Sequence, residues 1–132
     1  MKCLLCFFML FLVCAVPAAQ GGEIPTPMAV RVLVGEAGDQ GLKGMTCVAE
    51  VLRRRGSIKG FHGARSKHID REPAHIWTLA EQAWKQSAYT NYTNGADHFD
   101  NVRKFGTPWW ARHFIKVYEY KDHVFYRAIS RV

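Results

Sequence analysis

The spacing of apolar and polar positions predicts three helices in the first two thirds of the chain. Thr26 can cap a helix and Pro27 is tolerated at the first helical position, so a helix is expected to begin there and to end near 35–38. The apolar stripe of this first helix is expected to comprise Met28, Val32 and Leu33.

Two further helices are expected downstream, separated by a polar, glycine-containing loop over 57–72. The second helix runs from about Leu42 to Arg55 and is followed by Gly56, a favourable C-terminal stop. Its apolar positions follow the i, i+3, i+4, i+7 spacing of one buried face: Met45, Val48, Ala49 and Leu52. Pro73 can open the third helix, whose apolar face is Ile76, Leu79, Ala80, Ala83 and Trp84.

The last third of the chain has the shorter apolar periods of strands. A turn over 90–95 precedes a short strand over 96–99, and an irregular but aromatic segment follows over 105–110. Apolar Ile115 and Val117 alternate with Lys116 and Tyr118, and a strand over 124–126 is expected to return after a turn at Lys121–Asp122. Three helices followed by a small antiparallel sheet predict an α+β domain.

The N-terminus carries the features of a secretory signal peptide. Lys2 is followed by an apolar run over 4–16 and by the small residues of a cleavage site over 17–19, which predicts a signal at residues 1–19. The run is shorter than the roughly 20 residues that span a bilayer as a helix, so no stable membrane insertion is expected after removal of the signal. A lipid anchor at Cys14 is an alternative. Export to the periplasm or the cell wall, with one domain over 20–132, is the favoured interpretation.

Cysteine content and charge limit the remaining possibilities. Three of the four cysteines lie in the predicted signal, so Cys47 is left alone and is expected to be a small buried side chain. The chain has 18 basic and 11 acidic residues, a net charge of +7, which suggests an anionic partner such as nucleic acid, a membrane surface or the cell wall. Much of this charge lies at Arg53, Arg54 and Arg55, where a basic cluster closing a helix is usually solvated.

Glu36 is the candidate catalytic residue. It follows the apolar residues Val32, Leu33 and Val34 at the expected end of the first helix. Apolar walls disfavour the charged form of a carboxyl, so such a group can stay protonated near neutral pH and deliver a proton to a glycosidic oxygen. The acid glutamate of lysozyme, in its hydrophobic pocket, acts in this way. Gly35 and Gly38 would let a bulky polymer approach the backbone closely.

Several blocks of sequence, in order, resemble the SleB-type cell wall hydrolase family. They cover almost the whole chain after the signal: Val34-Gly35-Glu36-Ala37, Gly41, Gly44-Met45, Val48 to Leu52, Arg53-Arg54-Arg55, Asn94 to Asn101, Pro108-Trp109-Trp110 and His123 to Arg127. The resemblance implies a lysozyme-like catalytic domain that cleaves peptidoglycan glycan strands, with Glu36 as the catalytic acid. Arg54 is a departure, because many members have Asn there, and the separate wall-binding domain of the spore enzymes has no counterpart in this sequence.

The resemblance favours lytic transglycosylation over hydrolysis. In that reaction one glutamate protonates the leaving oxygen and then deprotonates the 6-hydroxyl of the muramic acid, giving a 1,6-anhydro product. Hydrolysis would usually require a second carboxylate about 5–5.5 Å or about 6.5–9.5 Å from the first, and Asp97 or Asp100 are the candidates.

The remaining candidate residues are assigned to sugar binding. His98, Phe99 and Asn101 are expected to line the groove, although Phe99 fits a core position equally well. Trp109 or Trp110 would offer a flat face to a sugar ring, and Tyr126 could hydrogen-bond the sugar or pack in the core.

No metal or cofactor is expected, because none of the six histidines has a paired ligand spacing on one helix. The rival class is a non-catalytic wall- or nucleic-acid-binding module. The export signal and the lack of a basic–aromatic alternation argue against nucleic acid, and a monomer is expected.

Overall fold

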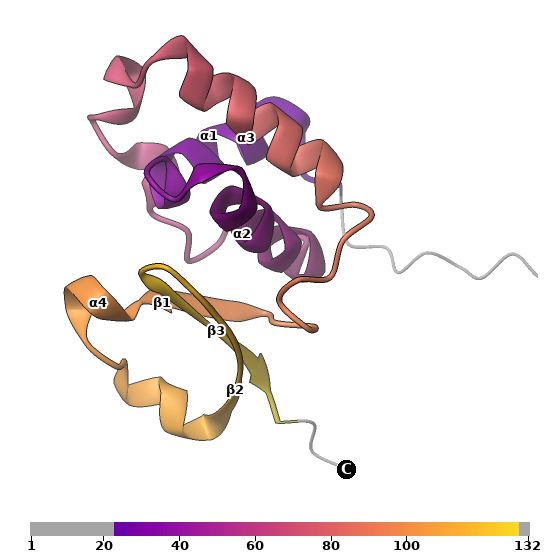
Figure 1. Cartoon of the computed structure of the whole chain (residues 1–132), viewed down its shortest axis with the longest axis vertical. Coiled ribbons are helices and arrows are strands. Elements are labelled where there is room, and N and C mark those ends of the chain that lie inside the picture. The colour runs from indigo at the N-terminus through magenta and orange to yellow at the C-terminus, as the bar shows by residue number, and fades with distance from the viewer. Residues whose placement is uncertain (1–22, 130–132) are drawn as a thin grey trace, which may run out of the picture.

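The computed structural model describes residues 23–129, in which helices form one half of the molecule and a small sheet forms the other (Figure 1). The predicted signal at 1–19 lies outside the described residues. The three main helices are α1 (Thr26–Ala37), α2 (Gly41–Arg55) and α3 (Ala74–Gln86). Short 3-10 helices η1 (Gly63–Arg65) and η2 (Ile69–Arg71) interrupt the connection between α2 and α3. The predicted α+β class is therefore confirmed.

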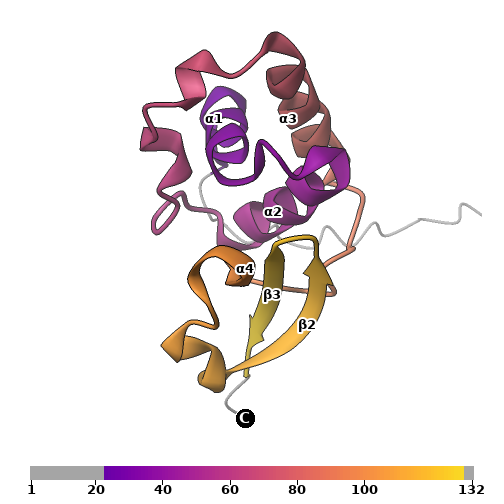
Figure 2. The ribbon, with the colours of Figure 1, turned by 60° about the vertical axis from the view of Figure 1, so that its left-hand side comes forward.

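Strands β1 (His98–Asn101), β2 (Phe114–Tyr120) and β3 (His123–Ala128) form an antiparallel sheet in the order β1-β3-β2. The β2–β3 hairpin turns at Lys121–Asp122, as the sequence predicts, and Lys121 has the positive φ of a tight turn. Between β1 and β2 the chain forms α4 (Val102–Phe105) and the 3-10 helix η3 (Trp109–His113), which lie beside the sheet (Figure 2).

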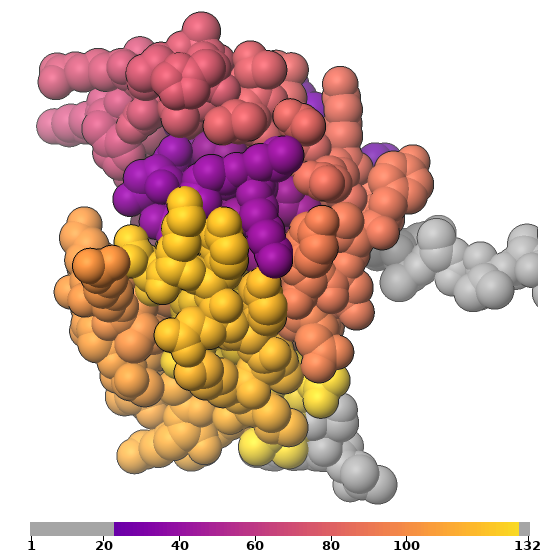
Figure 3. Space-filling model, viewed as in Figure 1, coloured from indigo at the N-terminus to yellow at the C-terminus, as the bar shows by residue number. Residues whose placement is uncertain are grey.

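One apolar core joins the helices to the sheet. α1 and α2 bury aliphatic side chains on most of their surface, and Phe125 of β3 is fully buried against the same cluster. The space-filling view shows the hairpin packed directly beneath the helical layer (Figure 3). A smaller cluster, comprising Ala111, Val124 and Tyr126 with Trp110 packed against them, lies under η3.

The arginines at the end of α2 hydrogen-bond to three different segments: the end of α3 and two loops. Arg53 donates to the hydroxyl of Ser87 at 2.7 Å and to the carbonyl of Trp84 at 2.6 Å, at the end of α3. Arg54 donates to Thr93 and to the carbonyl of Ala96, both at 2.8 Å. Arg55 donates to the carbonyl of Lys59 at 2.6 Å. Arg54 and Arg55 are exposed, as expected of a solvated cluster, but all three side chains also hydrogen-bond to neighbouring segments, which meet at the C-terminus of α2.

Glu50, one turn before Arg54, fixes the loop that leads into β1. Its carboxylate is buried and accepts hydrogen bonds from the hydroxyls of Thr90 and Thr93 and from the backbone N–H groups of Tyr92 and Thr93. A buried carboxylate is tolerated when its oxygens are satisfied in this way. Glu50 and Arg54 together hold 90–96 and so set the position of β1. Arg54, at which this sequence departs from the family it resembles, thus makes structural hydrogen bonds of its own.

Several local predictions need correction. Thr26 is not the cap of α1: Pro25 occupies that position and no side chain caps the helix. Met28, assigned to the apolar stripe of α1, is 41% exposed. Ala29 and Val30, which were not assigned to that stripe, are buried instead, because other elements pack against α1 on several sides. Pro73 is the residue before α3 rather than its first residue.

The predicted sheet positions shift by a few residues. β1 begins at His98 rather than Ala96. Residues 106–108 are irregular as expected, while the two ends of the segment 105–110 belong to α4 and η3. In β2 the register shifts between Lys116 and Tyr118, so the expected alternation is broken and Ile115 is exposed.

Candidate functional site

A cleft of about 790 Å³ lies between the helical half and the sheet half of the molecule. One wall is the end of α1, over 34–39, together with the loop over 60–68. The other wall is β1 with Lys104 and Phe105 of α4, Trp110 of η3 and His123 of β3. Its polar lining includes acidic residues, basic residues and two histidines: Glu36, Asp39, Glu72 and Asp100, Arg55 and Lys104, and His62 and His68.

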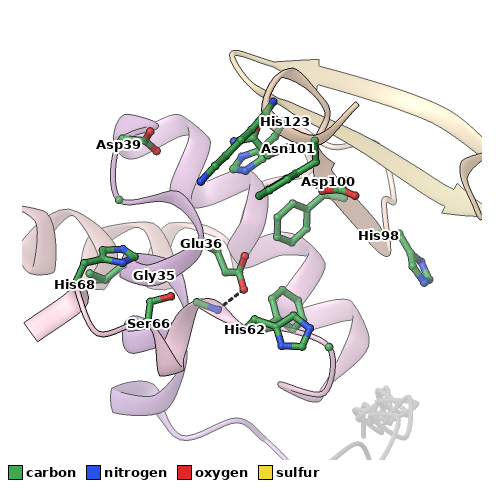
Figure 4. A pocket seen from close by; sticks show the side chains of 18 of the residues that line it. Gly35, Glu36, Asp39, His62, Ser66, His68, His98, Asp100, Asn101 and His123 are labelled. Atoms are coloured by element: carbon green, nitrogen blue, oxygen red, sulfur yellow. Dashed lines mark hydrogen bonds between the residues drawn. The ribbon is translucent and has the colours of Figure 1, made fainter. Parts of the chain in front are cut away.

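Glu36 lies in the last turn of α1 and extends into this cleft (Figure 4). It is partly buried, and its Oε1 accepts a hydrogen bond from the backbone N–H of Gly63 at 2.6 Å. This bond ties the carboxyl to a loop 27 residues further along the chain. A short hydrogen bond from a rigid backbone donor fixes the orientation of the side chain.

The hydrogen bond to Oε1 leaves Oε2 without a hydrogen bond from the described residues. Oε1 therefore acts as an acceptor of the loop N–H, and Oε2 has no partner within the described part of the chain. The geometry therefore distinguishes the two oxygens of one carboxyl, because Oε1 is held by the loop and Oε2 is open to a ligand in the cleft.

Two glycines make this arrangement possible. A Cβ on Gly35 would overlap the carbonyl group of Gly63, and a Cβ on Gly63 would lie 2.5 Å from the backbone nitrogen of Glu36 and 2.8 Å from its Cγ. Gly35 is part of the cleft lining, but the space that its side chain would occupy is filled by the chain's own loop. Gly35 and Gly63 instead allow the loop to cross α1 closely enough to reach the carboxyl.

The two candidate second carboxylates have different surroundings. Asp100 lines the cleft (Figure 4). Asp97 is not part of its lining; its Oδ1 contacts Nδ1 of His98 at 2.8 Å and accepts a hydrogen bond from the backbone N–H of Ala128 at 3.1 Å. Of the two, only Asp100 is placed where a ligand beside Glu36 could meet it.

Three of the predicted sugar-binding residues line the cleft: His98, Phe99 and Asn101. Phe99 also packs against the core and lies 5.8 Å, centroid to centroid, from the ring of Phe61, so it serves both roles that the sequence left open. The side-chain oxygen of Asn101 accepts from the backbone N–H of Lys104 at 2.9 Å and caps α4.

The structure does not bring Trp109 or Tyr126 into the cleft lining. Trp109 is 75% exposed, whereas its neighbour Trp110 both lines the cleft and packs in the small cluster under η3. Tyr126 is buried in that cluster against Trp110, and its burial raises the pKa of its hydroxyl. Which of two adjacent tryptophans turns inward depends on the helical turn of η3, which composition does not reveal.

Other cleft residues were not anticipated from the sequence. His62, Ser66 and His68 come from the loop over 60–68, and His123 comes from the start of β3. The sequence of this loop has no periodic apolar pattern, so it did not indicate which side chains point into the cleft. The available signal for His123 was its position as the first residue of a block, His123 to Arg127, that resembles the SleB-type family.

Cys47 is fully buried in α2, as predicted, and burial raises the pKa of its thiol to about 12. Such a thiol is not a nucleophile near neutral pH. Within residues 23–129, no cluster of three or more histidine, cysteine or acidic side chains is arranged to hold a metal ion. Over the same residues, no helix has both the length and the apolar character needed to cross a membrane.

Comparison of the chain with models of protein families, with curated proteins and with solved structures gave no significant match. Any assignment of activity therefore depends on the geometry of the cleft and on the resemblance described above.

Proposed function

We propose that this chain is an exported peptidoglycan-degrading enzyme that cleaves the bond between MurNAc and GlcNAc, with Glu36 as its catalytic acid. The observation that carries the proposal is the carboxyl of Glu36, held at one oxygen by Gly63 N–H and directed into a cleft of about 790 Å³. A cleft of this size between two halves of a domain suits several residues of a sugar polymer. A lysozyme-like domain, implied by the family resemblance, is part of the same proposal.

The favoured reaction is lytic transglycosylation by a single carboxyl. Oε2 of Glu36 gives its proton to the glycosidic oxygen as the bond from that oxygen to C1 of the muramic acid breaks. The 6-hydroxyl oxygen of the same sugar then bonds to C1, and its proton returns to Glu36. No water is consumed, and the intramolecular nucleophile has a high effective molarity.

Hydrolysis with a second carboxylate is the alternative, and the place of Asp100 in the cleft lining is the observation that favours it. There Asp100 would activate a water or act as the nucleophile. Asp97 is the weaker candidate because its carboxylate is engaged by His98 and by the backbone of Ala128.

Mass spectrometry of purified sacculi digested with the protein tests the proposal. Transglycosylation gives muropeptides ending in 1,6-anhydromuramic acid, which are lighter by one water than the reducing ends that hydrolysis leaves. Anhydro products support the favoured chemistry, and reducing ends would replace it with the Asp100 alternative. Undigested sacculi would contradict the enzyme proposal and promote a wall-binding module instead.

A further inference from the structure

The ring of His123 is a buried polar group whose place in the fold is not explained by packing. It is 3% exposed and packs beside Phe99 and Phe125, with ring centroids 5.2 Å and 6.2 Å from its own, while those two rings also contact each other at 5.8 Å. Its Nδ1 is the one buried side-chain nitrogen or oxygen among the described residues that has no hydrogen-bond partner. A buried polar atom without a partner destabilises a fold, because it loses its hydrogen bonds to water and gains none in return.

A phenylalanine would pack against the same two rings without leaving a polar atom unsatisfied. A histidine at this position is therefore favoured over a phenylalanine only if its other ring nitrogen makes a hydrogen bond. The ring also forms part of the cleft lining, next to Asn101, its partner in the β1–β3 register (Figure 4). Because Nδ1 is sealed in the core, Nε2 is the nitrogen that remains for the cleft.

We propose that Nε2 of His123 is a substrate contact in the cleft, where it donates a hydrogen bond to an acetamido or hydroxyl oxygen of the glycan. In the tautomer with the proton on Nε2, the buried Nδ1 is an acceptor without a donor. In the other tautomer Nδ1 would carry a buried N–H without an acceptor. This inference rests on the proposed function, and it names a residue that binds the sugar rather than one that transfers the proton.

The electrostatic surroundings agree with a neutral donor. Burial lowers the pKa of His123, and the nearby carboxylates of Asp39, Asp122 and Asp100 offset only part of this effect. Near neutral pH the ring is therefore uncharged and carries a single N–H. Asp122 is itself held by Gln40, whose amide donates to it at 3.3 Å and to Asp39 at 2.8 Å. This bridge ties the hairpin turn, and with it His123, to the end of α1.

The substitution His123→Phe separates a binding role from a packing role. If Nε2 binds the glycan, the variant should lose roughly tenfold in kcat/KM on soluble glycan strands, the effect of one hydrogen bond. Its thermal midpoint should stay equal or rise, because an unpaired polar atom is removed. His75→Phe, at an exposed histidine of α3 outside the cleft lining, is the matched control and should change neither activity nor stability.

Nitrogen NMR of the intact protein gives a second readout that does not depend on turnover. Glu36→Gln protein is titrated with β-1,4-linked N-acetylglucosamine oligomers, and the Nε2 signal of His123 should shift as the sugar binds. An unmoved signal at saturating sugar, or a His123→Phe variant as active as the parent, would overturn the inference while leaving the proposed function standing. If the parent protein does not digest sacculi at all, the proposed function itself fails and this inference fails with it.

Discussion

The chemistry proposed for Glu36 depends on how its two oxygens are distinguished. The sequence indicated an acid at the end of an apolar helix, and α1 does end one residue after Glu36. The backbone N–H that donates to Oε1 belongs to Gly63, in a loop whose sequence did not indicate which residues face the cleft. Residue type and helix periodicity therefore predicted where the carboxyl lies but not what orients it, since that contact joins positions far apart in the chain.

A prediction at the same scale concerns the pH dependence of stability at His123. Its pKa in the folded protein lies below the ordinary value of 6.5 because the ring is buried, so the unfolded chain binds a proton more readily. This group therefore disfavours folding increasingly as the pH falls below about 6.5, and its effect is absent above that value. As the pH is lowered from 7 to about 5, the thermal midpoint of His123→Phe should therefore rise relative to that of the parent protein. Parallel midpoint curves for the two proteins would contradict the burial of a neutral imidazole.

At the scale of elements, the site is built by loops that α1 and α2 hold in place. The sequence predicted α2 and its glycine stop, and Gly56 has the expected left-handed conformation. It did not predict that the arginines before Gly56 would hydrogen-bond to the end of α3 and to two loops, or that Glu50 would hold the approach to β1. An amphipathic pattern shows which face of a helix is buried, but the partners of its polar side chains depend on loops that have no pattern of their own.

The crossing of α1 by the loop over 60–68 gives a prediction for Gly63→Ala. The new methyl group would lie 2.5 Å from the backbone nitrogen of Glu36, so the loop must move away from α1. Overpacking of this kind lowers stability by about 1–3 kcal/mol. Because the Gly63 N–H to Glu36 hydrogen bond would be lost as well, digestion of sacculi should fall.

Urea unfolding and a sacculus-clearing assay measure the two effects of Gly63→Ala. Lys67→Ala, an exposed position in the same loop outside the cleft lining, should leave both nearly unchanged. A Gly63→Ala protein with the stability and activity of the parent would show that the close approach of loop and helix is not needed.

For the whole molecule, the fold joins a helical half and a sheet half across one core and leaves the cleft at their boundary. The class of the fold and the order of its main elements followed from periodicity, because helices and strands differ in their spacing of apolar positions. The composition of the cleft did not follow, as Trp109 and Trp110 illustrate: both are large aromatics, and only the turn of η3 decides which one faces inward. The net charge of +7 agrees with an anionic polymer as partner but does not select one.

The central claim is that Glu36 supplies the proton that cleaves the glycan, and Glu36→Gln tests it most directly. A glutamine keeps an oxygen to which Gly63 N–H can donate, so the thermal midpoint should stay close to that of the parent. It has no proton to give, so the rate of sacculus clearing should fall by at least about 100-fold. Glu81→Gln, which makes the same chemical change on the exposed side of α3, should clear sacculi at the parental rate. A folded Glu36→Gln protein that still clears sacculi at that rate would contradict the assignment.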